Sequence, residues 1–444
     1  MADTADVVVI GAGVIGCSIG YELARGGYSV MVLDQGPGAG HGSTSASSAI
    51  VRFNYSTYPG VAVAWEGLGV WTDWREHLQG DDDGSLARFV KTGTLCLDSP
   101  DIDPPKILAH FDTVGVPYQI WDADTIRQRI PQLDPARFYP PKPVDSDEFF
   151  DDPDGELGGF WTPDAGFIDD PTFATHNLMV AAQRLGAGFR FRTAVAGVRT
   201  AGGRVTGVDL ADGSHLDAPV VVNAAGPFSA RLNAIAGVLG DFTISTRPLR
   251  VEVHQFTAPP GYGAGLVPQA DPDALPVGPL LADLDTGHYS RGTLTGELIV
   301  GGTEPACDPM HWVDDPDQVS PALTQQVYRA QSYRAARRMP DLTVPNTPRG
   351  IVGVYDVTDD WIPIYDRTAL PGFYVAIGTS GNQFKNAPLV GMFLTEIITA
   401  CENGRDHDVT PVTVTLPRTG NRVDLSTYRR TRPITASSSF TVMG

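Results

Sequence analysis

The chain has 444 residues, of which 42% are hydrophobic and 19% charged, so it is an ordinary globular chain and long for a single hydrophobic core. Its formal net charge of −20 at pH 7 argues against binding to nucleic acid or to an anionic membrane surface. We therefore expect two domains, or one elaborate domain, with neither kind of polyanionic partner.

The cysteines and the N-terminal residues indicate the compartment. The four cysteines are scattered, without the paired spacing that holds zinc or an iron–sulfur cluster, so we interpret them as reduced thiols and expect no metal site. The apolar run at 7–10 is too short for a signal peptide or a membrane span. The sequence therefore predicts a cytoplasmic protein.

The first 25 residues have the pattern of a nucleotide-binding strand, turn and helix. A β-branched strand at 7–10 leads into a glycine turn, and a helical pattern then continues through Arg25. In such a turn Gly11 permits the tight bend, Gly13 lets a pyrophosphate approach the backbone, and Gly16 allows close helix packing. We expect a dinucleotide to bind at this helix N-terminus.

The second strand, at 28–33, ends in Asp34, where a carboxylate can accept hydrogen bonds from the ribose hydroxyls of an adenine nucleotide. A loop of small hydroxyl residues at 42–48 and a long, irregular, Pro-rich region follow, whereas a nicotinamide enzyme usually continues with further strand–helix units. Strand patterns resume at 189–192, 195–198 and 204–210, which alternate like short antiparallel strands. A buried strand follows at 218–226. A nucleotide domain resumed around an inserted domain is typical of FAD enzymes.

The inserted segments are expected to form a substrate domain with an antiparallel sheet. The best strand candidates are 250–256 and 296–301. We place Tyr55, Tyr289 and His254 near its pocket, and for each the alternative is an ordinary core residue.

The C-terminal part of the chain contains a strand at 373–377, a glycine turn at 378–381 and a helix from Ala387 onward. The helix N-terminus carries a partial positive charge that can stabilise an anionic reduced ring. Beyond Arg405 no motif is visible, and this segment could cover the entrance or a partner. Its basic residues are most simply explained as a solvated tail; they are Arg429, Arg430 and Arg432.

Five sequence blocks occur in a characteristic order. They are VVVIGAGVIGCSIGYELARGGYSVMVLDQG (7–36), GSTSASSAIVRFNYS (42–56), DAGFIDDPTFATHNLMVAAQRLGA (164–187), VVVNAAGPFS (220–229), and GVYDVTDDWIPIYD with AIGTSGNQFKNAPLVG (353–366 and 376–391). In these blocks the chain resembles the D-amino-acid oxidase superfamily of FAD-dependent oxidoreductases, most closely its sarcosine oxidase and N-methyl amino acid oxidase branch.

The resemblance implies bound FAD and an amino-acid-like substrate. In the family, a lysine matching Lys385 projects over the flavin and, with an arginine matching Arg52, grips the substrate carboxylate. A guanidinium offers a bidentate fork and an ammonium adds a point charge, so the pair suits this task. The alternatives are a surface salt bridge for Arg52 and a solvated charge for Lys385.

The expected site residues follow from the motifs and the resemblance together. We expect Arg52, Lys385, Tyr55 and Tyr289 to act on the substrate. The residues expected to bind FAD are Gly11, Gly13, Val14, Ile15, Gly16, Asp34, Gln35, Ser43, Thr44, Ser47, Ser48, Val195, Ala225, Gly226, Gly378, Gly381, Asn382, Gln383, Phe384 and Lys385.

Departures from the family pattern bear on the cofactor and on oxygen. Relatives that attach FAD covalently carry a cysteine at the position of Gly353 or a histidine at that of Ala46, so we expect non-covalent FAD, with His41 as the residual candidate for attachment. The lysine that favours electron transfer to O2 aligns with Ile299. Another cation, such as His288 or Arg291, could serve in its place, or the electrons could leave to a different acceptor.

The prediction is therefore an α/β protein of two domains. We expect a discontinuous FAD-binding domain of Rossmann type over 1–85, 161–243 and 350–444, and an α+β substrate domain with an antiparallel sheet over 86–160 and 244–349. The predicted activity is oxidation of the amine of an amino acid or N-alkyl amino acid to an imine, with O2 or another acceptor reoxidising the flavin. The alternatives are oxidation of a 2-hydroxy acid or alcohol, and a non-catalytic flavoprotein subunit.

Overall fold

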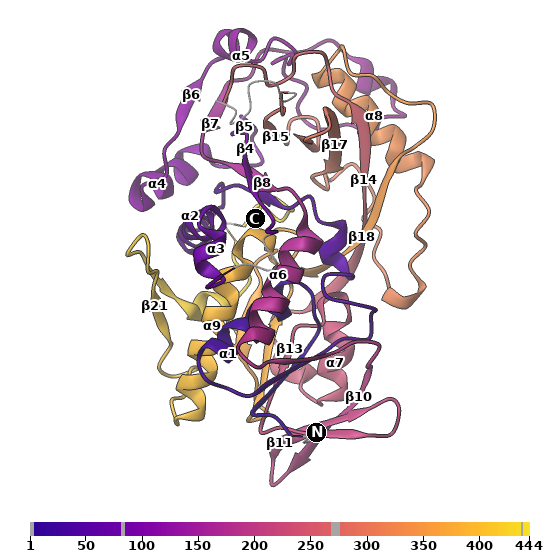
Figure 1. The fold of residues 1–444 in the computed structure, drawn as a ribbon. Coiled ribbons are helices and arrows are strands. Elements are labelled where there is room, and N and C mark those ends of the chain that lie inside the picture. The colour runs from indigo at the N-terminus through magenta and orange to yellow at the C-terminus, as the bar shows by residue number, and fades with distance from the viewer. Residues whose placement is uncertain (1–3, 81–84, 268–275, 437) are drawn as a thin grey trace.

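The computed structural model describes residues 4–80, 85–267, 276–436 and 438–444, which form two lobes (Figure 1). The lower lobe of the view contains the N-terminal strands and the helices α1, α6, α7 and α9. The upper lobe contains α4, α5 and α8 around a large sheet. The C-terminal end of the chain lies between the lobes.

A six-stranded sheet forms the framework of the lower lobe, in the order β19-β20-β13-β1-β2-β9. Its neighbouring strands pair in parallel except for β19, which is antiparallel to β20. The bounds are β1 Val7–Ile10, β2 Val30–Leu33, β9 Gly188–Arg190, β13 Val220–Asn223, β19 Ile364–Arg367 and β20 Phe373–Ile377. Because β1 and β13 are covered on both faces, they are continuous apolar runs rather than alternating ones.

The glycine turn lies at the carboxyl end of the inner strand β1, where the first helix begins. Helix α1 (Val14–Arg25) packs against α6 (Pro171–Arg184) and α9 (Ala387–Glu402). All residues of α1 except its last are buried. The predicted strand–turn–helix unit and the predicted helix from Ala387 are confirmed.

The short strands after α6 divide between two sheets. Strands β10 (Val195–Ala201), β11 (Arg204–Leu210) and β12 (His215–Asp217) form the expected antiparallel sheet. Strand β9, which begins the predicted antiparallel set, instead pairs in parallel with β2. The antiparallel assignment was wrong here because alternation along a strand does not reveal its partner or its direction.

An eight-stranded sheet forms the upper lobe, in the order β18-β14-β17-β16-β15-β5-β7-β6. It is antiparallel apart from the pair β15 and β5. The bounds are β5 Thr94–Leu97, β6 Gln119–Trp121, β7 Gly159–Thr162, β14 Thr246–Thr257, β15 Leu280–Asp283, β16 His288–Gly292, β17 Glu297–Gly302 and β18 Gly350–Thr358. Strand β18 lies in the segment expected to rejoin the FAD-binding domain at residue 350, yet it is the edge strand of this sheet.

One face of the large sheet is covered by α8 (Gln325–Arg338), which packs on β14, β16 and β17. The remaining helices are α2 Tyr58–Thr72, α3 Trp74–His77, α4 Pro104–Val114, α5 Ala123–Arg129 and α7 Ser229–Ile235. Two small sheets complete the fold, one of β3 (Ile50–Val51), β8 (Gly166–Ile168) and β4 (Phe89–Lys91), the other of β21 (Thr413–Thr415) and β22 (Arg422–Asp424).

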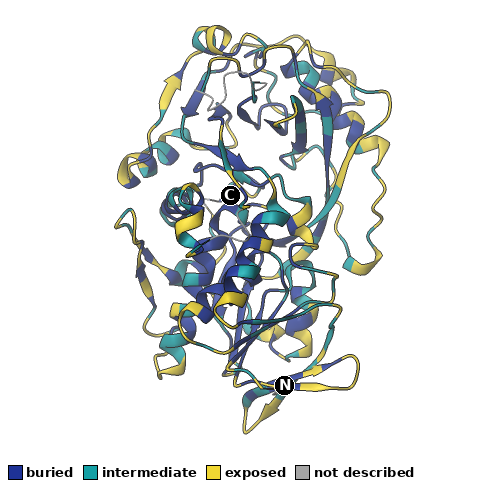
Figure 2. Ribbon diagram, in the orientation of Figure 1, coloured by how far each residue is buried: buried dark blue, intermediate teal, exposed yellow. Residues whose placement is uncertain are grey.

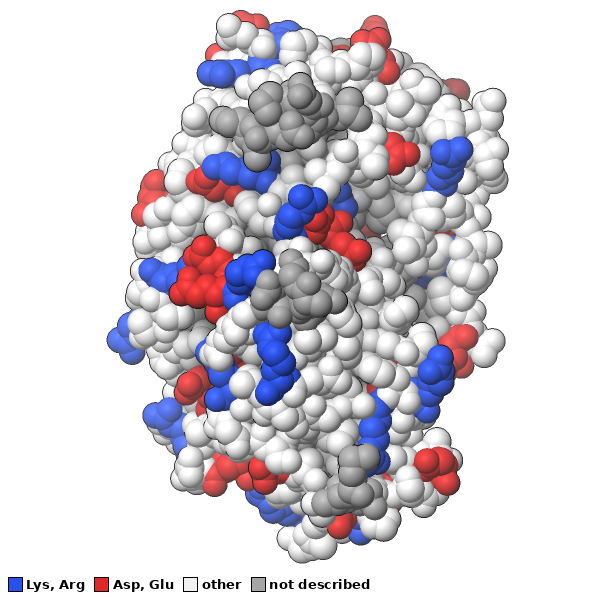
Figure 3. Space-filling model, in the orientation of Figure 1, with Lys and Arg blue, Asp and Glu red and all other residues white. Residues whose placement is uncertain are grey.

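The two lobes share a hydrophobic core. The largest cluster of buried apolar side chains includes Val7 of the six-stranded sheet together with Leu280 of the eight-stranded sheet. Figure 2 shows burial concentrated along the inner strands of both lobes. The surface of the face in Figure 3 carries interspersed acidic and basic side chains. Within the described ranges, no helix has the length and apolarity needed to cross a membrane.

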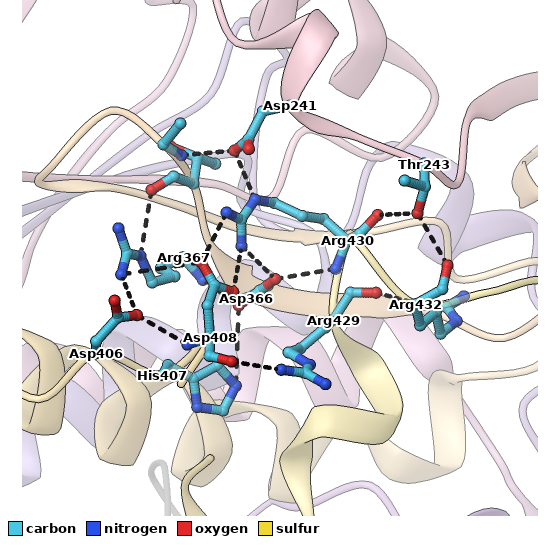
Figure 4. A network of polar contacts seen from close by, with 12 residues as sticks. Asp241, Thr243, Asp366, Arg367, Asp406, His407, Asp408, Arg429, Arg430 and Arg432 are labelled. Atoms are coloured by element: carbon cyan, nitrogen blue, oxygen red, sulfur yellow. Dashed lines mark hydrogen bonds and ion pairs between the residues drawn. The ribbon is translucent and has the colours of Figure 1, made fainter. Parts of the chain in front are cut away.

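The C-terminal basic residues are not a solvated tail. Arg430 and Arg432 are only 3% and 6% exposed, and both form ion pairs, of which Figure 4 shows that of Arg430. Arg430 binds Asp366 on β19, and Arg432 binds Asp360, which is fully buried. The expectation was wrong because the acidic partners are distant in sequence and a charge run does not show where they lie.

Candidate functional site

A cavity of about 760 Å³ lies between the two lobes. It begins at the ends of β1 and β2 beside the glycine turn and continues to the face of the large sheet opposite α8. All but two of the residues expected to bind FAD line it, and the exceptions are Gly16 and Gly378. Arg52 and Tyr289 also line it, so the structure brings both groups of predicted residues into one cavity.

The glycine turn has no room for side chains. Gly11 has φ of +107°, and a Cβ there would lie 2.3 Å from the Ala224 carbonyl oxygen. A Cβ on Gly16 would lie 1.8 Å from the Gly11 carbonyl oxygen, which explains why Gly16 packs within the turn and not on the cavity. Gly13 is the N-cap of α1 and supplies no side-chain cap. The helix N-terminus is therefore open toward the cavity, as an anion-binding turn requires.

Asp34 and the hydroxyl loop frame the same end of the cavity. The Asp34 carboxylate accepts hydrogen bonds from the backbone N–H groups of Ala12 and Gly36, both at 2.6 Å, so it is fixed against the turn. Thr44 lies in a short 3₁₀ helix, Ser43–Ala46, and its hydroxyl accepts from the backbone N–H of Val14 at 3.1 Å. The loop thus packs directly on the start of α1.

The two positions expected to decide covalent attachment, Gly353 and Ala46, lie close together. A Cβ on Gly353 would lie 3.1 Å from the Cβ of Ala46, and both residues line the cavity. Neither carries a nucleophile. His41 also lines the cavity, whereas none of the four cysteines does.

Two buried cations lie at the other end of the cavity. Arg52 is 6% exposed and Lys385 is 3% exposed. The Arg52 guanidinium donates to the carbonyl oxygens of Asn54 and Val442, each at 2.7 Å, and the Lys385 ammonium donates to the Asn382 carbonyl oxygen at 2.7 Å. Across the described residues neither cation forms an ion pair with a carboxylate. A pair of buried charges without a counter-ion is costly unless a ligand supplies the opposite charge.

Tyr55 lies against both cations and does not itself line the cavity. Its ring centroid is 5.0 Å from the Arg52 guanidinium carbon and 5.0 Å from the Lys385 nitrogen. Its hydroxyl donates to the Asn382 carbonyl oxygen at 2.6 Å. The tyrosine thus supports the cations through its ring face and orders the turn that carries Lys385.

The protonation of these groups is set by burial. Burial, and secondly the charge of Arg52, holds the pKa of Lys385 well below its ordinary value. Burial lowers the pKa of Arg52 as well. A bound anion offsets both effects, because it favours the charged form of each side chain.

His288 and Arg291, the two cations expected as alternatives to a lysine at Ile299, lie on opposite faces of β16. Tyr289 lines the cavity, and its hydroxyl hydrogen bonds with Ser48 at 3.0 Å. Arg291 extends from the same face of the strand without lining the cavity, and it donates to the Ser48 carbonyl oxygen at 2.8 Å. Arg291 is paired across the sheet with Ile299, so the two side chains share a face. His288 points to the opposite side, where it hydrogen bonds with Thr286. Arg291 is therefore the cation that lies beside the position of the missing lysine.

Two further residues lie away from the cavity. His254, which we expected near the pocket, is fully buried on the α8 side of the sheet, where it hydrogen bonds with Gln331 at 2.7 Å. Gly378 has φ of +68° and donates its N–H to Asp356 at 2.6 Å, so it shapes the turn after β20. Strand periodicity alone does not tell which face of a buried strand meets a pocket.

Sequence reasoning missed three contributors to the site. Val442 and Met443 line the cavity near Arg52, although they lie at the far end of the chain. Tyr355 lines it too and hydrogen bonds with Tyr289. No local pattern marks the C-terminal residues, because their role depends on where the chain is led after Arg432.

Comparison with known proteins gives the family. Residues 6–397 match the sequence profile described as "DAO: FAD dependent oxidoreductase". The chain belongs to the DAO family. A curated D-amino acid dehydrogenase of Methylobacterium radiotolerans is 27% identical over 341 residues, covering 67% of this chain and 75% of that protein. A glycine oxidase of Geobacillus kaustophilus is 23% identical over 417 residues, covering 92% and 96%.

Solved structures of similar proteins have the same fold. The crystal structure of L-proline dehydrogenase from P. horikoshii aligns with a TM-score of 0.72 at 23% identity, covering 97% of this chain and 98% of that one. DAO-family members bind FAD, and the observed cavity fits this cofactor: it has an open helix N-terminus for a pyrophosphate, the Asp34 carboxylate beside it, and a cradle at Gly11 that a single Cβ would fill.

The glycine turn allows a direct test of the cofactor site. Gly11→Ala places a methyl group against the Ala224 carbonyl, so we expect FAD affinity to fall at least about tenfold. Gly27→Ala is the matched control, because Gly27 also has positive φ (+88°) but has no atom within 4 Å of an added Cβ. Affinity is measured by titrating FAD into apoprotein. Equal affinity in the two variants would contradict the assignment of the turn.

Proposed function

We propose that the protein oxidises the amine of an amino acid or N-alkyl amino acid to an imine, using FAD. The observation that carries the proposal is the pair of buried cations, Arg52 and Lys385, at one end of the FAD cavity without an acidic partner in the described chain. Such a pair is suited to a carboxylate. The dehydrogenase and oxidase names of the relatives agree with this substrate class.

Arg52 and Lys385 recognise the carboxylate in complementary ways. The planar guanidinium offers two parallel donors, and the ammonium adds a point charge. The carboxylate lies between them, which relieves their mutual repulsion and raises the pKa of Lys385 back toward its ordinary value. Binding the carboxylate at this end orients the neighbouring C–N bond toward the rest of the cavity.

The same cations influence the substrate amine. A positive environment disfavours the ammonium form, so a proton leaves the substrate more readily on binding. Burial raises the pKa of Tyr289, and its hydroxyl stays neutral as a hydrogen-bonding group beside Ser48. When bound, the flavin supplies the two-electron acceptor for the substrate C–H bond.

We further propose that FAD is bound without a covalent bond. Gly353 and Ala46, the two attachment positions of relatives, lack nucleophiles and lie against each other on the cavity wall. The cofactor would be held by the glycine turn, Asp34 and the hydroxyl loop 43–48.

Arg291 supports O2 as the electron acceptor. It extends from the same face of β16 as the cavity-lining Tyr289, beside Ile299, and it is held just behind the cavity wall by the carbonyl of the lining residue Ser48. A fixed positive charge near a reduced flavin favours electron transfer to O2, because it stabilises superoxide. The arginine thus supplies the charge that the aligned isoleucine cannot.

The role of Arg52 in carboxylate binding is tested by removing its guanidinium group. In Arg52→Met we expect kcat/KM for amino acids to fall by roughly 30- to 4000-fold, because truncating one partner of a buried charge pair costs about 2–5 kcal/mol. The measurement is anaerobic flavin bleaching with a panel of N-methyl, cyclic and primary amino acids and 2-hydroxy acids. Arg88→Met, which removes a side chain that is 72% exposed, is the control. Bleaching by 2-hydroxy acids alone, or by no compound of the panel, would contradict the proposed reaction.

Cofactor attachment is tested by acid precipitation of the purified protein. We expect the yellow FAD to appear in the supernatant, since the cavity wall presents no cysteine. Flavin retained in the pellet, and released by His41→Ala, would show attachment through His41.

The role of Arg291 is tested by following reoxidation of the reduced enzyme in air. We expect Arg291→Met to slow this step about tenfold or more while leaving anaerobic bleaching by substrate intact. Arg291→Lys keeps the charge and should restore much of the rate. Equal rates in all three proteins, or no reoxidation in the unaltered one, would exclude Arg291 as the oxygen cation.

A further inference from the structure

The C-terminal segment ends inside the site. Val442 and Met443 both line the cavity and are almost fully buried. The end of the chain lies between the two lobes (Figure 1). Val442 contacts Arg52 directly, since its carbonyl oxygen accepts from the guanidinium at 2.7 Å.

Buried ion pairs fix the course of the C-terminal segment before it reaches the cavity. Arg430 binds Asp366 at 2.9 Å and Asp408 at 2.9 Å, and it also reaches Asp241 (Figure 4). Because these acids come from separate loops and from β19, Arg430 can bind all of them only in one place. The segment is therefore fixed to the nucleotide-binding lobe where it leaves that lobe.

Asp360 provides a second fixed point. Its carboxylate binds Arg432 at 2.7 Å and accepts from the backbone N–H of Thr435 at 3.3 Å. Its backbone carbonyl accepts from the Ser438 hydroxyl at 2.6 Å. One buried aspartate thus holds the segment at three residues before it enters the cavity.

The backbone of Val442 lies between Arg52 and Glu304. Its carbonyl accepts from the Arg52 guanidinium, and its N–H lies near the Glu304 carboxyl, where it acts to lower the pKa of that group. Glu304 is strained, with φ of +53°, and its second oxygen is buried without a partner in the described chain. Burial raises the pKa of Glu304 to about 8, so it is largely neutral at pH 7 and leaves the charge of Arg52 available to a ligand.

We propose that residues 441–444 complete the substrate site: the Val442 carbonyl positions Arg52, and Met443 limits the length of the substrate side chain. This inference rests on the proposed function, because it takes Arg52 as the carboxylate ligand. With Asn54 on one side of the guanidinium and Val442 on the other, the plane of the fork is set before a substrate arrives.

Met443 is placed to act as a wall. Met443 lines the cavity together with Thr94, Leu280 and Ala282 of the large sheet, whose backbone positions are fixed by the pairing of β5 with β15. We therefore expect the space left for a substrate side chain to depend on the residue that the C-terminal segment contributes. A flexible thioether fills such irregular space well.

The wall is tested by changing its size. We expect Met443→Ala to raise kcat/KM for phenylalanine relative to glycine by about tenfold or more, and Met443→Trp to lower the same ratio. Each ratio is measured by anaerobic flavin reduction with glycine and with both enantiomers of alanine, leucine and phenylalanine. Met392→Ala is the matched control, because Met392 lies on α9 away from the cavity. A ratio that is the same in all four proteins would overturn the role of Met443.

A binding assay separates this inference from the proposed function. Acetate and phenylacetate are titrated against the oxidised flavin spectrum, which needs no turnover. We expect Met443→Ala to strengthen phenylacetate binding relative to acetate. A chain ending at Thr441 should bind acetate about tenfold more weakly, since Arg52 loses the Val442 carbonyl. If that chain does not retain flavin, the Met443 variants still decide the role of the wall.

The outcomes are distinguishable. Amino acid turnover with unchanged size selectivity in the Met443 variants would retain the proposed function and refute the inference. If the Met443 variants change the selectivity between acetate and phenylacetate, but no amino acid reduces the flavin, the inference would stand and the proposed function would be refuted.

Discussion

The site depends on the burial of two like charges side by side. Arg52 and Lys385 have no acidic partner in the described chain, so their desolvation is offset only by the carbonyl oxygens of Asn54, Val442 and Asn382 and by the face of Tyr55. Carbonyl dipoles stabilise a buried cation less than a carboxylate does, and the difference is what an anionic ligand gains on binding. An acidic partner for either residue would stabilise the free protein and weaken the site.

This arrangement explains why the site is assembled from distant segments. Arg52 follows the short strand β3, Lys385 lies in the 3₁₀ helix Phe384–Asn386 just before α9, and Val442 belongs to the C-terminal segment. Each backbone must be held without placing an acid near the cations. The acidic residues are instead used farther out, where Asp360 and Asp366 bind Arg432 and Arg430. Charge neutralisation thus occurs along the approach to the cavity, and uncompensated charge is kept within it.

Short sequence patterns correctly predicted those parts of the fold that depend only on neighbouring residues. The turn from β1 to α1, the end of β2 at Asp34 and the start of α9 each follow from glycine positions and apolar runs of a few residues. The partner of β9, the membership of β18 in the large sheet and the burial of Arg430 depend on contacts between segments far apart in the sequence. The same limit applies within the site: the cations were visible in the family motifs, but the C-terminal wall has no motif and could be found only from coordinates.

The charge of the whole molecule and that of the site have opposite signs. With 52 acidic and 32 basic residues, the protein as a whole repels an anionic substrate, whereas the cavity attracts it. The Debye length at physiological ionic strength is about 8 Å, so distant surface carboxylates are screened while the buried cations act at contact distance. Recognition therefore depends on short-range contacts in a region of low dielectric and not on long-range steering. For such a site the orientation of the guanidinium matters as well as its charge, which is why we propose that the backbone carbonyl bound to Arg52 contributes to specificity.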